Sequence, residues 1–378
     1  MISFALHTSP GKGSLRAVAC AYQCVAAHEA RSIGGHFVRS TNIAGVTSVQ
    51  QTEFPPLAQA VLKASRHKCA AALTKSLKAI PRGSTMCVAA SGGADSTALA
   101  LLSKAVLRRG QWNLCLATVN HNLRDAATLD TEFAQRLAKW LDVPCHVLQV
   151  HPGAGAGVAD RARKHRYDAL NQAALKAGAI VILTAHHAQD QLETMLLRLA
   201  RGAGPKAIGG MRARRTFKSG VMLLRPLLEQ SREELRALLT HANVPWREDP
   251  TNSDETKPRA RIRAKILPVL ESVHKGAAVR ASRAGRRLRE SGRLLQKTAQ
   301  NVLVGVGPWP RGVLRAHGPA LLATALKRFD AKANERELEA AVSAIRDRVS
   351  KPRVFQVGKN SVRVRARQVL LVTSHQMK

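Results

Sequence analysis

Residues 91–96 have the composition of a turn that binds phosphate. They follow an apolar run at 86–90 and precede a stretch with helical periodicity. A helix N-terminus offers an anion free backbone N–H groups and the positive end of the helix dipole. A carboxylate at this place implies a bridging cation, for which Mg²⁺ is the first candidate, whereas the alternative is an ordinary turn whose Asp and Ser only cap the helix. The predicted nucleotide-binding residues are Ser91, Gly92, Gly93, Ala94, Asp95 and Ser96.

Polar residues also close two later strand-like runs. Residues 120–124 follow one run, and His186 to Thr194 follow the other. At helical spacing His186, Asp190 and Glu193 share one side of a helix, so Asp190 is a second candidate ligand for Mg²⁺, opposite Asp95. A lone histidine usually satisfies only a hydrogen bond. A transition-metal site is the weaker alternative, because the H-E-x-x-H spacing is absent.

The elements around these residues alternate between apolar runs and amphipathic stretches. The predicted strands are 84–90, 113–119, 145–150 and 179–184, and the predicted helices are 96–109, 127–141, 158–177 and 188–200. This alternation predicts an α/β fold in which helices cover both faces of a parallel sheet. Ligands of such sheets bind beyond the carboxyl ends of the strands, and all three polar runs fall there.

The charge of the chain points to a polyanionic partner. Sixty Lys and Arg residues against 25 Asp and Glu residues give a net charge of +35 over 378 residues. Nucleic acid is the leading candidate, because each neutralised phosphate releases counterions, whereas no apolar run is long enough to span a membrane. With only 3% aromatic residues, recognition of a folded RNA by shape and backbone fits better than base stacking. Six cysteines without C-x-x-C spacing indicate a reducing cytoplasm.

Composition also divides the chain into expected regions. The acid-poor N-terminal region resembles an organellar transit peptide, although an upstream start codon or a disordered basic extension fits equally well, and 56–79 has helical periodicity. The Gly-rich stretch 201–211 is expected to be a mobile loop. The regions are a basic extension at 1–80, a catalytic domain at 81–216, a helical basic region at 217–305 and a small α+β domain at 306–378.

The Ser-Gly-Gly-x-Asp-Ser string between a strand and a helix resembles the pyrophosphate-loop (PP-loop) ATPases, which cleave ATP between its α and β phosphates. Further motifs make the chain similar, over about 80–272, to the tRNA(Ile)-lysidine synthase family. These motifs are V-N-H-x-L-R at 119–124, A-R-x-x-R-Y at 162–167, the string 187–194, R-G-x-G at 201–204, R-P-L-L at 225–228, W-x-E-D-P-T-N at 246–252 and R-x-R-I-R at 259–263.

The resemblance implies a Rossmann-like domain of the adenine-nucleotide α-hydrolase type. It also implies an enzyme that uses ATP and Mg²⁺ to adenylate O2 of the wobble cytidine in an isoleucine tRNA with a CAU anticodon, and then joins free L-lysine to C2. The implied catalytic residues are Asp95, Asp190, Arg124 and His187, with Asp95 and Asp190 as metal ligands. The implied lysine-binding residues are Asp190, Glu193 and His121. The predicted tRNA-binding residues, taken from the clustering of basic charge and from the A-R-x-x-R-Y motif, are Arg163, Arg166, Arg201, Lys206, Arg259, Arg261 and Arg263.

Three residues depart from the family pattern, namely Ala159, Gln189 and Ala260. These departures are expected to affect the affinity for lysine or for tRNA. A thiolating PP-loop enzyme is the first alternative, but it needs a reactive or cluster-binding cysteine near the loop. A non-catalytic RNA-binding protein is the second alternative. The sequence does not decide whether the chain forms a homodimer.

Overall fold

The computed structural model describes residues 53–107, 112–120, 125–151, 158–248, 255–305 and 307–372. The chain divides into two compact units, 1–51 and 52–378, and all of the described residues belong to the second. Across these ranges no helix is both long enough and apolar enough to cross a lipid bilayer.

A six-stranded sheet lies at the centre of the first part of this unit, in the order β3-β2-β1-β4-β6-β5. All neighbouring strands are parallel except β5 and β6. This sheet confirms the predicted α/β class, and its apolar strands are those expected of a sheet buried on both faces. The strands are β1 Thr85–Ala89, β2 Asn113–Asn120, β3 Cys145–Gln149, β4 Ala179–Leu183, β5 Arg214–Thr216 and β6 Met222–Leu224.

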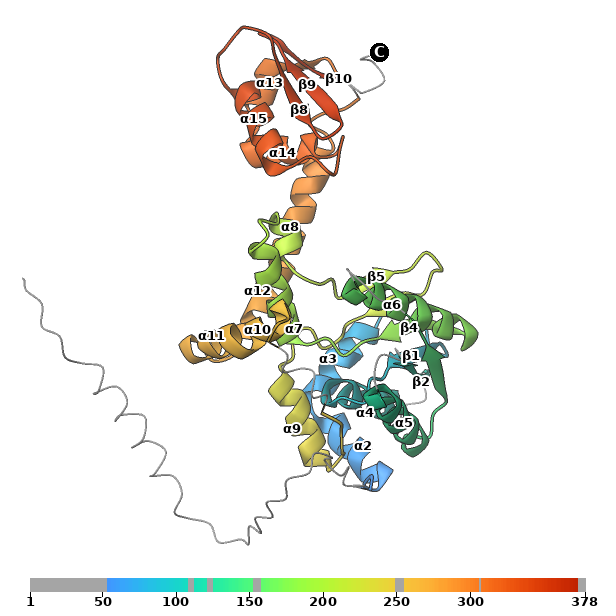
Figure 1. Ribbon diagram of the computed structural model, residues 1–378. Helices are drawn as coiled ribbons and strands as arrows, with labels where there is room; N and C mark the ends of the chain where they lie inside the picture. Colours follow the sequence, from blue (N-terminus) through green and yellow to red (C-terminus); the bar gives the residue numbers. More distant parts are fainter. Residues whose placement is uncertain are drawn as a thin grey trace, which may run out of the picture. The chain divides into compact units, whose positions relative to one another are not determined.

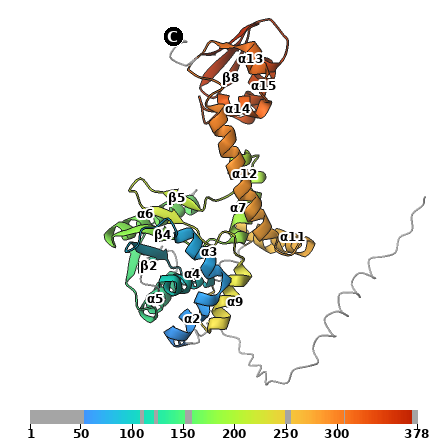
Figure 2. The ribbon, with the colours of Figure 1, turned by 180° about the vertical axis from the view of Figure 1, so that it is seen from behind.

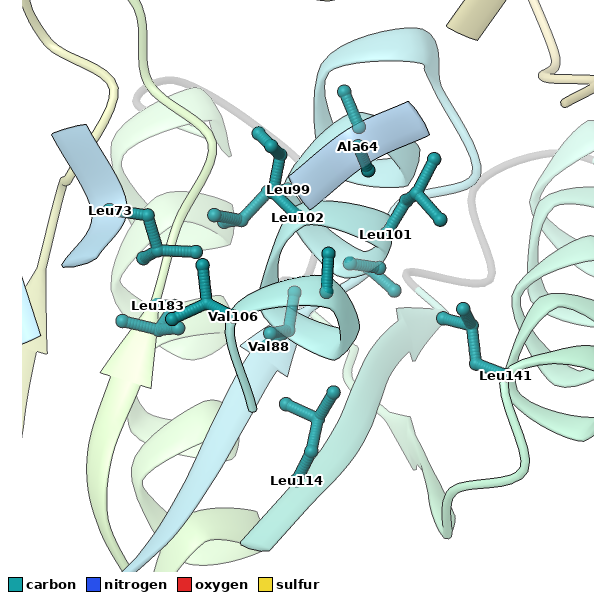
Figure 3. Close-up of a cluster of buried hydrophobic side chains, with 14 of the residues drawn as sticks. Ala64, Leu73, Val88, Leu99, Leu101, Leu102, Val106, Leu114, Leu141 and Leu183 are labelled. Carbon is teal, nitrogen blue, oxygen red and sulfur yellow. The ribbon is translucent and has the colours of Figure 1, made fainter. Parts of the chain in front are cut away.

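Helices cover both faces of the sheet, as Figure 1 shows. Alternate residues of β1 point to opposite sides: Val88 packs in the cluster that includes α4 and α5, and Cys87 packs in the cluster that includes α6. Figure 3 shows the larger cluster, in which leucines of α4 meet strand residues such as Val88 and Leu183. The covering helices are α4 Ala94–Leu107, α5 Asp125–Trp140, α6 Val158–Lys176 and α9 Arg232–Ala242.

Two helices before β1 belong to this core, so the expected boundary at residue 80 differs from the structure. Helix α2 (Leu57–Arg66) buries Ala60 and Ala64 completely in the larger cluster, and helix α3 (Lys68–Leu77) buries Leu73 and Leu77 there. Residues 1–52 lie outside the described residues. The amphipathic pattern at 56–79 therefore marks a structural part of the sheet domain, since buried apolar area is what stabilises such helices.

The Gly-rich stretch 201–211, expected to be a mobile loop, is instead packed against a helix distant in sequence. It contains the short helix α8 (Pro205–Ile208), which contacts α12 (Ala277–Ala299), and α12 also contacts α7 (Ala188–Leu199). Figure 2 shows α12 beside α7. A Cβ placed on Gly285 of α12 would lie 2.8 Å from the Gly209 carbonyl oxygen. The glycines thus permit a close backbone approach that larger residues would block.

The linking segment and the C-terminal module complete the chain. Helix α10 (Pro258–Arg261), the π-helical turn η2 (Ile262–Ile266) and α11 (Leu267–Val273) precede α12. The C-terminal module has a second hydrophobic cluster and a four-stranded antiparallel sheet in the order β7-β10-β9-β8. Its elements are β7 Trp309–Pro310, α13 Arg311–Arg315, α14 Pro319–Leu326, α15 Glu335–Arg346, β8 Arg353–Val357, β9 Asn360–Val364 and β10 Gln368–Val372.

Candidate nucleotide and RNA site

The predicted phosphate-binding turn connects β1 to the N-terminus of α4. Ser96 Oγ accepts a hydrogen bond from the Ser91 backbone N–H at 3.1 Å and donates one to the Gly93 carbonyl oxygen at 3.0 Å. Gly92 has φ of 78°, and a Cβ at this position would lie 3.3 Å from the Asp130 carbonyl oxygen. The turn therefore has the tight left-handed geometry that requires glycine, and it leaves the start of α4 available to an anion.

A residue near the end of the sheet domain braces this turn. The Arg247 backbone N–H donates to the Gly92 carbonyl oxygen at 3.0 Å, and Arg247 Nε donates to Asp130 Oδ1 at 2.7 Å. Asp130 is on α5, so Arg247 ties the turn, through its backbone, to the flanking helix, through its side chain. Sequence analysis missed Arg247, because its partners are more than one hundred residues away.

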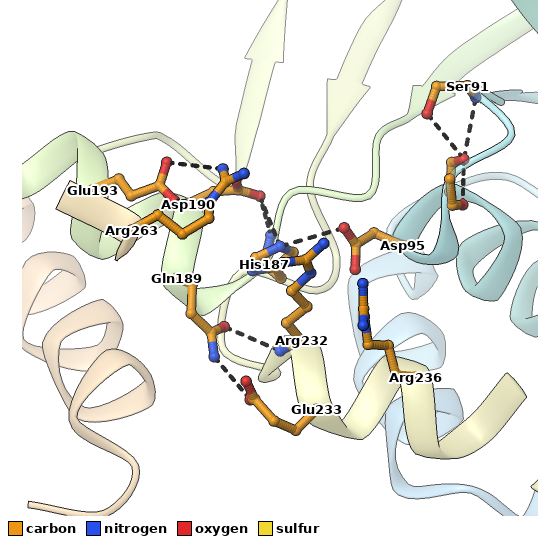
Figure 4. Close-up of polar contacts among 12 residues, drawn as sticks. Ser91, Asp95, His187, Gln189, Asp190, Glu193, Arg232, Glu233, Arg236 and Arg263 are labelled. Atoms are coloured by element: carbon orange, nitrogen blue, oxygen red, sulfur yellow. Dashed lines mark hydrogen bonds and ion pairs between the residues drawn. The ribbon is translucent and has the colours of Figure 1, made fainter. Parts of the chain in front are cut away.

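His187 lies between two acidic residues at the mouth of the sheet. Its Nε2 is 3.5 Å from Asp95 Oδ2 and 3.4 Å from Asp190 Oδ2, and Asp190 Oδ2 also accepts the His187 backbone N–H at 3.1 Å. Figure 4 shows this arrangement. Burial lowers the pKa of His187, but Asp190 and Asp95 outweigh burial and leave that pKa raised. The structure thus brings together three of the residues proposed for catalysis.

Asp95 is the residue on which a site for the expected Mg²⁺ ion depends. Its Oδ1 is buried and has no hydrogen-bond partner among the described residues, as expected of an oxygen reserved for a ligand. Asp190, expected to share the same cation, instead contacts His187 through Oδ2, so an imidazole stands between the two carboxylates. Within the described ranges no group of three His, Cys, Asp or Glu side chains is arranged to hold a metal. Asp95 is therefore the residue that fits Mg²⁺.

Glu193 and Arg263, expected to bind lysine and tRNA respectively, bind each other in the structure. Glu193 is fully buried, and its Oε1 accepts from Arg263 Nε at 2.8 Å while its Oε2 accepts from Arg263 Nη2 at 3.3 Å. Burial lowers the pKa of Arg263, but the Glu193 carboxylate outweighs it and raises that pKa. This ion pair joins η2 to α7, and the expected roles of Glu193 toward lysine and of Arg263 toward tRNA stay predictions.

Gln189, one of the departures from the family pattern, ties α7 to the start of α9. Its Nε2 donates to Glu233 Oε2 at 2.8 Å, and its Oε1 accepts the Arg232 backbone N–H at 3.0 Å. Ser231 caps α9 by accepting the Glu234 backbone N–H at 3.2 Å. Arg232 is consequently held at the first position of α9, beside the site. The capping pattern of 231–234 was readable in the sequence, but where Arg232 points was not.

Several cationic side chains lie around the carboxyl ends of β4 and β6. Arg225 is buried and donates to the Arg212 carbonyl oxygen at 2.8 Å, while the guanidinium groups of Arg163 and Arg166 lie over the Tyr167 ring. Burial lowers the pKa of Arg166, and it lowers the pKa of the neighbouring His186 to about 3. His186 is therefore a neutral imidazole within a cationic surrounding.

A cleft of about 1750 Å³ opens beside these residues. Among the described residues that line it, the only carboxylate belongs to Glu335. The cationic lining residues are Arg163, Arg198, Lys206, Arg212, Arg214, Arg215, Arg225, Arg289, Arg293, Lys327 and Arg328. Such a concentration of guanidinium groups suits the phosphate backbone of a nucleic acid.

The remaining predicted residues fall in different places. Arg201, Arg259 and Arg261 are exposed, Lys206 donates from Nζ to Gln296 Oε1, and Arg166 does not line the cleft. His121 and Arg124 lie outside the described residues.

The fold and the turn define a class of protein. The family model of the PP-loop domain matches residues 65–270, more than half of the chain. Among solved structures, the U34-tRNA thiolase NcsA from Methanococcus maripaludis is similar with a TM-score of 0.51 and 16% identity, covering 59% of this chain and 78% of that one. This likeness concerns the fold alone, and the chain is a member of the PP-loop class.

Curated relatives narrow the class to one family. The chain is 38% identical over 301 residues to a tRNA(Ile)-lysidine synthase of Salinispora tropica, covering 78% of this chain and 86% of the relative. A synthase of Salinispora arenicola is 37% identical over 73% of this chain and 84% of its own length. One from Bradyrhizobium diazoefficiens is 41% identical over 51% of this chain and 53% of its own length. The chain belongs to the tRNA(Ile)-lysidine synthase family.

Proposed function

We propose that this protein uses ATP to join L-lysine to C2 of the wobble cytidine in an isoleucine tRNA with a CAU anticodon. The observation that carries the proposal is the phosphate-binding turn with the unpartnered Oδ1 of Asp95, in a chain that belongs to the lysidine synthase family. The relatives' name supplies the identity of the RNA and of the modification.

The reaction divides into two steps. In the first, O2 of the cytidine forms a bond to the α-phosphorus of ATP, the bond from that phosphorus to the β-phosphate oxygen breaks, and pyrophosphate leaves with the electron pair. In the second, the ε-amine of lysine forms a bond to C2, AMP leaves from that carbon, and one proton is released. The first step needs positive charge around the leaving pyrophosphate.

Different residues serve these needs. The backbone N–H groups at the start of α4 bind phosphate, and Asp95 would hold Mg²⁺, which neutralises phosphate charge when bound. His187 stands between Asp95 and Asp190, and its raised pKa favours a positive charge that offsets part of their repulsion. Asp190 is the proposed partner of the lysine ammonium group. The basic cleft of about 1750 Å³ is the proposed binding site for the phosphate backbone of the tRNA.

The test is the formation of AMP from ATP and Mg²⁺, with and without the unmodified tRNA and with and without L-lysine. AMP formation that needs both, and that is lost in Asp95→Ala, supports the proposal. AMP formation that needs the tRNA but ignores lysine would reject lysine as the second substrate. No AMP formation under any of these conditions would reject the adenylation step.

A thiolating activity has less support from this chain. Among the described cysteines, burial raises the pKa of Cys69 to about 12 and that of Cys145 to about 11, and Cys87 and Cys115 are buried inside neighbouring strands. A nucleophilic cysteine needs a low pKa and access to substrate. If the protein were found to transfer sulfur from a persulfide donor to the tRNA, that result would support the thiolating activity.

A further inference from the structure

Arg232 brings an unpartnered positive charge to the mouth of the phosphate-binding turn. Its Nε is buried, and its guanidinium group makes no hydrogen bond or ion pair with any described residue. Figure 4 shows its side chain extending from the start of α9 toward His187 and Asp95. Its backbone N–H donates to Gln189 Oε1, so the start of α9, from which the side chain extends, is held beside the site.

The surrounding groups do not supply the missing anion. Arg236, one turn later on α9, also has a buried Nε without a partner, although its Nη2 donates to Glu248 at 2.7 Å. The Asp95 carboxylate is contacted by His187, and Glu233 is contacted by Gln189. A half-buried guanidinium group without a partner loses hydration and gains nothing in return. The arrangement therefore leaves room for an anionic ligand that brings its own charge.

Arg232 and Asp95 have complementary needs. Asp95 Oδ1 lacks a partner and fits a cation, whereas Arg232 lacks a partner and fits an anion. A phosphate chain with its bound cation satisfies both at once, and the N-terminus of α4 already marks where phosphate binds. A guanidinium group also suits phosphate oxygens because its planar fork donates two parallel hydrogen bonds.

We propose that Arg232 binds the β- and γ-phosphates of ATP from the side opposite the phosphate-binding turn, and afterwards the pyrophosphate that leaves. This inference rests on the proposed use of ATP. Negative charge grows on the oxygen between the α- and β-phosphorus atoms as that bond breaks, and Arg232 offsets it there. The positioning of Arg232 by Gln189 also gives this departure from the family pattern a role.

The test measures binding, not turnover. The dissociation constants of pyrophosphate, ATP and AMP are determined by titration calorimetry with Mg²⁺ for the full chain, for Arg232→Ala and for Arg232→Lys. Arg66→Ala is the matched control, because Arg66 is exposed on α2. Arg232→Ala should weaken pyrophosphate and ATP by about tenfold to a hundredfold, as expected for a charge-assisted hydrogen bond, and leave AMP within about twofold. Arg232→Lys should restore part of the loss, and Arg66→Ala should match the wild type.

Two results would overturn the inference. Equal weakening of AMP, ATP and pyrophosphate would mean that Arg232 supports the adenosine site or the fold, and unchanged binding of all three would mean that Arg232 contacts no phosphate. The experiments distinguish a failure of this inference from a failure of the proposed function. If the wild type forms no AMP with tRNA and lysine, while Arg232→Ala still loses pyrophosphate affinity selectively, the inference stands and the proposed reaction falls.

Discussion

Arg311 and Arg232 both carry guanidinium nitrogens buried from water, but only Arg311 has hydrogen-bond partners for them within the described residues. In the C-terminal module, Arg311 is fully buried, and its guanidinium group donates to the carbonyl oxygens of Ile345, Ala344 and Val349 at 3.1, 2.6 and 2.7 Å. It also donates to Asp347 Oδ1 at 2.7 Å. At the mouth of the sheet domain, Arg232 has a buried Nε and no partner among the described residues.

This difference separates buried polar groups that stabilise the fold from buried polar groups that bind a ligand. A buried polar group whose partners are all in the protein holds the fold together, and its loss appears as instability. A polar group that the fold positions but leaves without a partner, such as Arg232 or Asp95 Oδ1, points to a ligand, and its loss appears in binding or rate. Each prediction below tests that distinction.

The largest effect on stability is expected from Arg311→Met. This change leaves the carbonyl oxygens of Ala344, Ile345 and Val349 without their buried donor, while Asp347 keeps its hydrogen bond from Arg353. The cost should be about 3–5 kcal/mol, because three carbonyl oxygens lose their donor at about 1–3 kcal/mol for each one that stays buried and unsatisfied. Chemical denaturation followed by circular dichroism should show the C-terminal module unfolding first. Arg336→Met, on the exposed side of α15, is the control and should change little.

Asp95→Asn should show the opposite pattern. Because Oδ1 of Asp95 has no partner among the described residues and Oδ2 makes only the 3.5 Å contact with His187, the neutral amide should change the free energy of unfolding by no more than about 1 kcal/mol. AMP formation should fall by at least about a hundredfold, since the proposed cation loses its carboxylate. A large loss of stability with little loss of rate would place Asp95 among the structural residues and break the comparison.

Gly285→Ala should have an intermediate effect. The added methyl group would lie 2.8 Å from the Gly209 carbonyl oxygen and 2.9 Å from Met195 Sδ, so α8 must shift. Overpacking of this kind costs about 1–3 kcal/mol. Denaturation midpoints measure the cost, and filter binding measures whether the shift of α8 weakens the tRNA. Gly312→Ala is the matched control, since its added Cβ meets nothing within 4 Å on a helix and should be neutral or stabilising.

The local parts of the site could be predicted from the sequence. The turn at 91–96, the strands that precede it and follow it, and the placement of His187 at a strand end all depend on neighbouring residues, so periodicity and turn chemistry were enough. Gly92 illustrates this, because its φ of 78° is what a glycine in such a turn implies.

Contacts distant in sequence could not be predicted. The ion pair of Glu193 with Arg263 joins residues 70 positions apart, and the packing of Gly209 on Gly285 joins α8 to α12. A charge or a glycine looks the same in the sequence whether its partner is water, a ligand or another helix. For that reason the sequence does not show that Glu193 pairs with Arg263, and it wrongly indicates a mobile loop at 201–211.

The smallest effect should come from the acid response of the C-terminal module. The hydrogen bond from Arg353 Nη2 to Asp347 Oδ1, at 2.7 Å, lowers the pKa of Asp347, and the Val349 backbone N–H and Arg311 act in the same direction against a smaller effect of burial. A lowered pKa in the folded state adds stability above the unfolded value of about 3.9, and that stability is lost as the pH falls through the folded value. Asp347→Asn should therefore lower the Tm slightly at neutral pH and flatten its fall between about pH 5 and pH 3, while exposed Glu339→Gln should not. Because the hydrogen-bond partners of Asp347 all belong to the C-terminal module, ATP and tRNA binding at neutral pH should be unaffected. A loss of nucleotide binding in Asp347→Asn would mean that satisfied polar groups also serve the site, and that the contrast between Arg311 and Arg232 does not separate structure from function.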